Sequence, residues 1–181
     1  WAYAFTRIYT EPHSRVQASR WIYQHIPPGS ALTFEQWDDP LPLGIDGQSA
    51  GQYIGISTAP YGEDDQSKYT GYVANDGTYV EGLLAQLDRA DYIIFSSNRV
   101  YDSATRLPAR YPALTRYYYH LFQGDLGFEL VADIHSFPTL FGVEIPTPLL
   151  AEEAFSVYDH PRVLIFRKTA QYSRARTTQL I

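Results

Sequence analysis

The stretch Ala-Asp-Tyr-Ile-Ile-Phe-Ser-Ser-Asn-Arg-Val-Tyr, residues 90–101, decides the fold. Its apolar run, Tyr92–Phe95, shows no polar alternation, which is typical of a strand covered on both faces. Apolar residues recur at helical spacing before it, in residues 80–87, and after it, in residues 114–121. A second apolar run, Phe128–Ile134, then follows. The order helix, strand, helix, strand predicts a three-layer α/β domain with a mainly parallel sheet.

Further elements flank this unit. They are a helix over Arg15–His25 capped by Ser14, a strand over Ala31–Glu35, one possible strand over Tyr53–Ser57, and a final short helix capped by Ser173. Two more apolar runs, Phe155–Tyr158 and Val163–Lys168, are joined by the short link Asp159–Arg162. So short a link predicts a hairpin, and therefore an antiparallel pair at one side of the sheet.

Residues 44–77 are rich in Gly, Asp, Ser and Tyr, which predicts a long irregular loop. Loops of this length in compact domains are usually functional or mobile. The acidic cluster Glu63–Asp65 lacks the interleaved spacing and the glycine of a calcium loop, so a solvated acidic turn is favoured over a metal site. The chain shows no repeat and no change of composition, so residues 1–181 are predicted to form one domain.

The composition excludes several classes of protein. The 181 residues carry a formal net charge of −6 and contain no basic run, so no nucleic-acid partner is expected. Cysteine is absent, which excludes disulfides, thiolate metal sites and a cysteine nucleophile. The 16 tyrosines and 9 phenylalanines indicate either a sugar- or membrane-facing surface or a tyrosine-rich core.

The first residues, Trp1–Tyr9, place aromatic side chains at alternate positions. They fit an edge strand, or the interfacial end of a membrane helix whose remainder precedes Trp1, because Trp and Tyr gather at the headgroup level. Methionine is absent, including at position 1, so we expect the chain to be a processed or excised part of a longer protein. No apolar stretch of about 18 residues, the length of a membrane helix, occurs within it.

A compact group of chemistry-bearing residues follows the first predicted strand: Glu35, Trp37, Asp38 and Asp39. An indole beside carboxylates suits a carbohydrate or peptide acceptor, because the ring stacks and the carboxylates accept hydrogen bonds. The alternative is a buried Trp37, with the aspartates capping a turn before Pro40. Adjacent aspartates in an extended segment should point to opposite sides. A glycoside hydrolase would therefore need Glu35 or a distant acid in its carboxyl pair.

Ser96, Ser97 and Asn98 follow the central strand directly, at the edge where open α/β sheets usually bind ligands. They either contribute to such a site or cap the next turn. The glycines form no phosphate loop, no serine lies in a G-x-S-x-G turn, and no histidines have metal-ligand spacing. We therefore predict no metal site and no cofactor in this chain, and assign Ser97 and Asn98 to the candidate acceptor site.

Several stretches together resemble one known family. They are Arg7–Thr10, Pro12–Arg15, Ala18–Ile22, Ile26–Ser30, Glu35–Pro42, Asp91–Tyr101, Arg106–Pro108, Arg110–Pro112 and Phe155–Lys168. They are similar to the C-terminal soluble domain of multi-spanning bacterial membrane glycosyltransferases of the family 39 (protein O-mannosyltransferase-like) type, and of the related "YYY" membrane proteins. The resemblance covers nearly the whole chain.

The resemblance implies an extracytoplasmic domain at the cell membrane, part of a transferase that uses a lipid-phosphate sugar donor. In that superfamily the catalytic acid usually lies in an early extracytoplasmic loop between membrane spans, a region outside this chain, so the resemblance implies no catalytic residue here. The implied partners are the transmembrane part of the same polypeptide, the membrane surface, and a glycan or protein acceptor.

A looser parallel concerns acceptor binding. In oligosaccharyltransferases of the same superfamily a Trp-Trp-Asp motif binds the acceptor. Gln36–Asp38 lies in a similar order, but it contains one Trp and lacks the Tyr-Gly that follows the motif. A glycan-binding module without transferase activity is the alternative function, and a small stand-alone hydrolase is the third.

Overall fold

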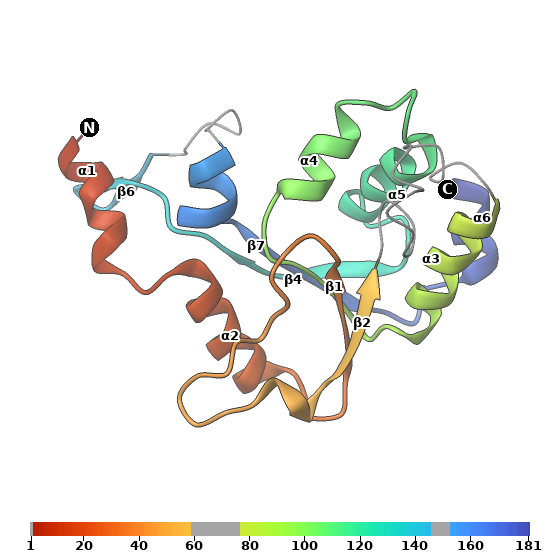
Figure 1. The fold of residues 1–181 in the computed structure, drawn as a ribbon, viewed down its shortest axis with the longest axis horizontal. Helices are drawn as coiled ribbons and strands as arrows, with labels where there is room; N and C mark the ends of the chain where they lie inside the picture. Colours follow the sequence, from red (N-terminus) through yellow and green to blue (C-terminus); the bar gives the residue numbers. More distant parts are fainter. Residues whose placement is uncertain (1, 59–76, 146–152) are drawn as a thin grey trace.

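The computed structural model describes residues 2–58, 77–145 and 153–181, whose arrangement is shown in Figure 1. A five-stranded sheet with the order β2-β1-β3-β7-β4 lies at its centre. The strands are β1 (Ala31–Glu35), β2 (Ile54–Thr58), β3 (Tyr92–Phe95), β4 (Phe128–Ile134) and β7 (Val163–Lys168). A separate two-stranded hairpin consists of β5 (Thr139–Leu140) and β6 (Val143–Glu144).

Most strands of the sheet run in one direction. β1 pairs in parallel with β2 and β3, whereas β7 pairs antiparallel with both β3 and β4. β4 therefore runs the same way as β1, β2 and β3. The α/β class, the mainly parallel sheet and an antiparallel strand at the C-terminal side are confirmed. β4 forms one edge of the sheet, and its pairing with β7 is interrupted by a bulge between Leu130 and Ala132.

The predicted hairpin partner of β7 is wrong. Ala154–Asp159 is a short π-helical segment and not a strand, and Val157 is its buried residue. The reason is the burial of β7, in which Val163–Phe166 are all buried. A strand covered on both faces in the middle of a sheet needs a neighbour on each side, and β3 and β4 fill both places.

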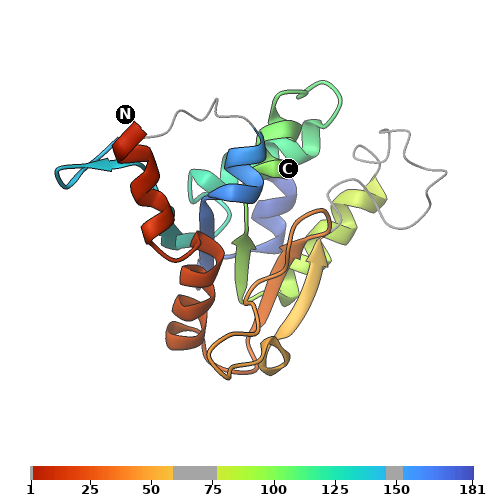
Figure 2. The same ribbon diagram turned by 60° about the vertical axis from the view of Figure 1, so that its left-hand side comes forward.

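Helices cover both faces of the sheet, so the three layers are confirmed (Figure 2). α2 (Ser14–His25) packs on one face, where Ala18 and Ile22 contact a cluster that includes Ile94 of β3. Ile93 and Phe95 belong to the cluster on the other face. That face is covered by α3 (Gly77–Arg89), α5 (Pro112–Phe122) and α6 (Arg174–Leu180), with α4 (Arg99–Thr105) beside α5.

The helix ends follow capping chemistry. α5 begins with Pro112, as its spacing predicts, and α6 begins after Ser173, whose Oγ accepts a hydrogen bond from the Arg176 amide at 3.4 Å. α2 differs from the prediction, because its cap is His13 and not Ser14. The His13 Nδ1 accepts a hydrogen bond from the Arg15 amide at 3.1 Å, and Ser14 is already the first helical residue.

The N-terminal segment is helical, so an edge strand is the wrong interpretation. α1 (Ala2–Thr6) continues into a 3₁₀ turn, Arg7–Thr10. Ala4 and Ile8 are buried, and their spacing of four places both on one side of a helix. The alternating aromatic residues therefore do not indicate a strand here. The buried residues Ala4 and Ile8 have helical spacing, and they determine the structure of this segment.

The predicted loop over residues 44–77 is more ordered than expected where it is described. It contains a 3₁₀ turn, Ala50–Gln52, and the strand β2, which confirms the possible strand predicted there. The acidic cluster Glu63–Asp65 lies outside the described residues. The connection after β4 also carries structure, because it contains the β5–β6 hairpin.

Gly127, between α5 and β4, permits a close approach of two backbones. Its φ is +75°, and a Cβ there would lie 2.3 Å from the Tyr172 backbone nitrogen.

We expect Gly127→Ala to lower the free energy of unfolding by about 3 kcal/mol or more, because alanine disfavours this backbone conformation and its Cβ would clash with the Tyr172 backbone. The matched control is Gly124→Ala, with φ +78° but no atom near its Cβ. Gly124→Ala should lower the free energy of unfolding by only about 1 kcal/mol. Urea unfolding followed by circular dichroism measures both variants. Equal losses would contradict the close contact.

Candidate functional site

The parallel pairing of β1 with β3 brings two polar segments to the same edge of the sheet. Trp37–Asp39 follow β1, and Ser96–Asn98 follow β3. The Ser96 Oγ donates to the Asp39 carbonyl at 2.7 Å, and the Ser97 Oγ donates to the Asp38 carboxylate. The two segments that the sequence analysis singled out separately are thus joined by direct hydrogen bonds.

Arg15, from the first turn of α2, holds this edge together. Its guanidinium is buried and contacts the Asp38 carboxylate at 2.8 Å and the Asp39 carboxylate at 2.6 Å. It also donates to the Ser96 carbonyl at 3.3 Å and the Val157 carbonyl at 3.0 Å. One side chain therefore links α2, the segment after β1, the segment after β3 and the π-helical segment.

An extended chain would point the side chains of Asp38 and Asp39 to opposite sides, but the structure does not show this arrangement. Asp38 lies in a tight turn, where its backbone amide donates to the Glu35 carbonyl at 3.0 Å, so strand alternation no longer applies. The Asp38 side chain is only 4% exposed, whereas that of Asp39 is 67% exposed. Both carboxylates reach the same guanidinium, but only Asp39 also faces solvent.

An aromatic and charged surface lies over this buried network. We call Trp37, Asp39, Arg99 and Tyr158 the Trp37 surface. Trp37 is 41% exposed, so the alternative of a buried indole is wrong, and Tyr158 is exposed as well. Arg99 connects them: it donates to the Trp37 carbonyl at 2.6 Å and to the Tyr158 hydroxyl, and its guanidinium carbon lies 4.9 Å from the centre of the Tyr158 ring.

Ser97 and Asn98 lie below the Trp37 surface and are buried. The Ser97 Oγ accepts a hydrogen bond from the Arg99 amide at 3.1 Å, so it caps the start of α4 as well as binding Asp38. Asn98 is the residue before α4, and its Oδ1 has no hydrogen-bond partner within the described ranges. Ser97 thus serves the capping role weighed in the sequence analysis, while Asn98 leaves an amide oxygen unsatisfied.

Glu35 is separated from the other candidates. Strand alternation turns its side chain toward α5, where the Tyr118 hydroxyl donates to its Oε1. Its Oε2 has no hydrogen-bond partner among the residues described. Burial raises the pKa of Glu35 to about 8, although the hydrogen bond from Tyr118 acts in the lowering direction. At neutral pH this carboxyl is therefore mainly neutral.

Three members of the network could not be assigned from the sequence. No local pattern gives Arg15 or Arg99 a role, and the strand predicted over Phe155–Tyr158 misplaces Tyr158, which lies in the π-helical segment. One signal was present for Arg15. Two adjacent aspartates beside a tryptophan need a counter-charge if either is buried, but the helix that precedes them carries two arginines, Arg15 and Arg20, and this signal does not choose between them.

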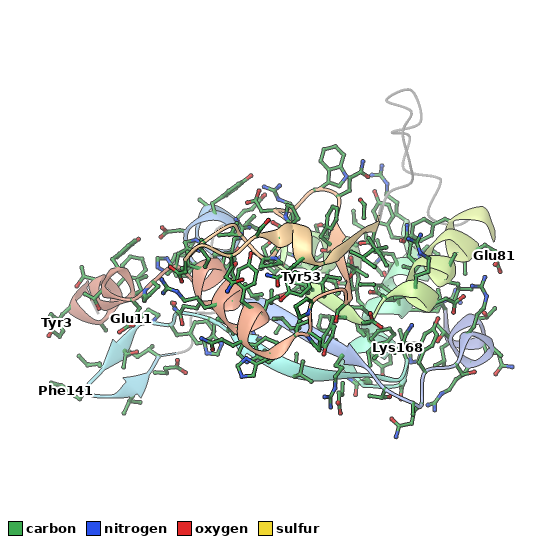
Figure 3. All side chains as sticks on the ribbon, turned by 90° about the horizontal axis from the view of Figure 1, so that it is seen from below. Tyr3, Glu11, Tyr53, Glu81, Phe141 and Lys168 are labelled. Carbon is green, nitrogen blue, oxygen red and sulfur yellow. The ribbon has the colours of Figure 1, made fainter. Side chains whose placement is uncertain are left out.

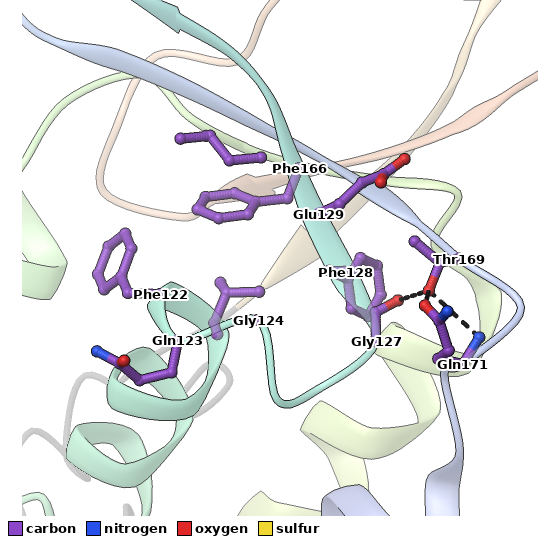
Figure 4. Close-up of a pocket in the computed structure, with 11 residues that line it drawn as sticks. Phe122, Gln123, Gly124, Gly127, Phe128, Glu129, Phe166, Thr169 and Gln171 are labelled. Atoms are coloured by element: carbon purple, nitrogen blue, oxygen red, sulfur yellow. Dashed lines mark hydrogen bonds between the residues drawn. The ribbon is translucent and has the colours of Figure 1, made fainter.

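Two cavities lie away from the Trp37 surface. The larger, about 240 Å³, lies between the end of α5 and β4, and Figure 4 shows Phe122, Phe166 and Phe128 along its wall. Two polar side chains at its rim bond to each other, because the Thr169 Oγ donates a hydrogen bond to the Gln171 Oε1 at 2.8 Å. The smaller, of about 10 Å³, borders Glu35. Each contains one carboxylate residue, Glu129 or Glu35, so neither offers the carboxyl pair of a glycosidase.

The described ranges contain no group of three His, Asp or Glu side chains placed to hold a metal ion. Within the same ranges, no helix combines the length and the hydrophobicity that crossing a membrane requires. Comparison with family models, curated proteins and solved structures finds no match for this chain. The case for a function therefore depends on the arrangement of the residues and on the resemblance stated above.

Removing Arg15 should destabilise the fold strongly, because it would leave the Asp38 carboxylate buried without its cation. We expect Arg15→Ala to lower the free energy of unfolding by about 3–5 kcal/mol. The control is Arg20→Ala on the same helix, which breaks an exposed pair with Asp46 and should cost less than about 1 kcal/mol. Urea unfolding of both variants tests this, and similar losses would show that the Arg15 network contributes little.

The raised pKa of Glu35 predicts a specific pH dependence. Between about pH 4.5 and 8 the unfolded chain releases this proton while the folded chain keeps it. The free energy of unfolding should therefore fall with rising pH across that window, and level off above it. Glu35→Gln should remove this slope and be more stable than the wild type near pH 8, by an amount on the order of a few kcal/mol.

The matched control for this experiment is Glu11→Gln, which changes an exposed glutamate. Thermal unfolding at several pH values should show the wild-type slope in that control. An unchanged slope in Glu35→Gln would mean that Glu35 titrates normally in the folded chain.

Proposed function

We propose that this chain is the extracytoplasmic domain of a membrane glycosyltransferase that uses a lipid-phosphate sugar donor, and that the Trp37 surface binds the acceptor. The domain would not be catalytic alone, because the family that it resembles carries its catalytic acid in a loop between membrane spans. The observation that carries the acceptor site is an exposed indole beside an exposed carboxylate: Arg99 binds the backbone carbonyl of Trp37, and the buried Arg15 binds the carboxylate of Asp39.

The chemistry of the Trp37 surface suits a glycan. The ring of Trp37 offers an apolar face to the C–H side of a sugar, and Tyr158 offers a second ring nearby. The Asp39 carboxylate can accept hydrogen bonds from sugar hydroxyls, and the Arg99 guanidinium can donate them. A sugar hydroxyl both donates and accepts hydrogen bonds, so a surface that offers an acceptor and a donor suits it.

The surface is also preorganised. Asp39 is held by Arg15, and Trp37 is held through its own carbonyl by Arg99. Ordering these groups before the ligand arrives lowers the entropy lost on binding. A rigid platform of this kind supports acceptor positioning better than it supports proton transfer, since its buried acid, Asp38, is occupied by Arg15 and Ser97.

The second candidate function is a glycan-binding module with no transferase activity. The same surface supports it, because recognition needs only the Trp37 surface and no donor site. The two functions differ in what the longer protein does. A transferase requires hydrophobic spans in the coding sequence before Trp1 and sugar transfer from a lipid-phosphate donor, whereas a module requires neither.

Trp37→Ala should weaken binding of a matching oligosaccharide about tenfold or more, because it removes the stacking face. Screening wild type against an oligosaccharide panel by Trp fluorescence and confirming hits by calorimetry identifies the ligand. The control Tyr119→Ala removes another exposed ring, from α5, and should leave the affinity unchanged. Binding that survives Trp37→Ala would exclude the Trp37 surface as the site.

The full-length protein separates the two candidate functions. In membranes supplied with a lipid-phosphate sugar, Trp37→Ala should raise the KM for the acceptor and leave kcat largely unchanged, since the chemical step lies elsewhere. Glycan binding without any transfer by the full-length protein would favour the module.

A further inference from the structure

One end of the molecule carries a group of exposed apolar side chains that the Trp37 surface does not include. α1 packs against β5 of the β5–β6 hairpin, and Figure 3 shows Tyr3 and Phe141 at this end. Phe141 is 95% exposed, Tyr3 is 68% exposed and Val143 is 67% exposed. We call these three residues the aromatic end. No other large apolar side chain in the described ranges is as exposed as Phe141.

Phe141 occupies a position that does not favour a phenylalanine. Leu140 pairs with Val143 across the hairpin, so Phe141 and Gly142 form its two-residue turn. Their φ angles are +50° and +82°, the conformation in which hairpin turns favour Asn-Gly. A bulky residue at positive φ is unusual, and a ring held in solvent adds no packing within the domain. A role outside the folded domain accounts for both facts.

The aromatic end is uncharged. Neither residues 2–6 nor residues 137–143 contain an acidic or basic side chain. Glu144, the last residue of the hairpin, has its carboxylate 3.5 Å from the Nε2 of His135, which directly follows β4. An ionic partner would find no charge to recognise at the tip.

The aromatic end is fixed to the body of the protein. The ring of Phe5 lies 5.7 Å from that of Phe155, and the Tyr9 hydroxyl donates to Asp159 at 2.7 Å. The Tyr9 ring also contacts His160 edge-on at 5.0 Å. α1 is therefore tied to the π-helical segment, and Figure 2 shows the hairpin projecting beside it.

We propose that the aromatic end inserts into the interfacial layer of a lipid bilayer, with Phe141 reaching furthest. A projecting loop that exposes Phe and Tyr without charge suits the headgroup region, where aromatic rings are favoured. The net charge of −6 would oppose an anionic membrane, so the attraction is apolar and the surface that fits is zwitterionic. The inference deepens the proposed function, because it names the residues on which the domain would lie at the membrane of its transferase.

Flotation of the protein with phosphatidylcholine vesicles tests the inference. Wild type should float with the vesicles, and raising the salt concentration should not release it. Phe141→Asn should lower the partition coefficient at least about tenfold, since the ring supplies most of the inserted area. Asn suits the positive φ of the turn, so the hairpin should persist and unfolding stability should not fall.

The control variant is Tyr119→Gln, which removes an exposed ring from α5 and should float like wild type. Trp37→Ala should also float like wild type. Loss of glycan binding and loss of vesicle binding therefore test the proposed function and this inference separately. The inference would be overturned by no flotation of wild type, by equal flotation of Phe141→Asn, or by flotation that requires anionic lipid. A wild-type dimer that Phe141→Asn converts to a monomer would likewise overturn it, by assigning the aromatic end to self-association.

Discussion

The buried guanidinium of Arg15 is the constraint on which the arrangement of the candidate site depends. A buried cation must have every N–H near an acceptor or a counter-charge, and the acceptors here come from different parts of the chain. Asp38 and Asp39 follow β1, the Ser96 carbonyl follows β3, and the Val157 carbonyl belongs to the π-helical segment. Placing Arg15 in the first turn of α2 therefore fixes the positions of these segments relative to one another.

Three acids close together in the sequence have different environments. Glu35 still follows the alternation of β1 and turns toward α5, where burial keeps it mainly neutral at pH 7. Asp38 lies in the turn beyond the strand and pairs with a cation. Asp39 shares that cation but stays open to solvent. Of these three acids, this division leaves Asp39 as the one whose carboxylate is accessible at the Trp37 surface.

The sequence predicts the layers well and the site only in part. The apolar run of β3 and the periodicity of α3 and α5 are strong local signals, since each is set by burial against its nearest neighbours. Phe155–Tyr158 fails as a strand because an apolar run of four residues does not distinguish a strand from a helical turn. The contact of Arg15 with Asp38 joins residues 23 positions apart, and no local pattern encodes such a pairing. The roles of Trp37 and Asn98 in binding remain predictions.

The bulge between Leu130 and Ala132 lies on β4, a strand with an open side. An open strand is a template on which another chain can add, and a flat one does so readily. The bulge bends β4 locally, and Asp133 and Glu129 along it are paired with Arg162 and Arg167. A second molecule approaching this border would meet a twisted backbone and fixed charges. Sheet-to-sheet aggregation through β4 is therefore disfavoured, and crowding many copies side by side should not assemble them into fibres along this border.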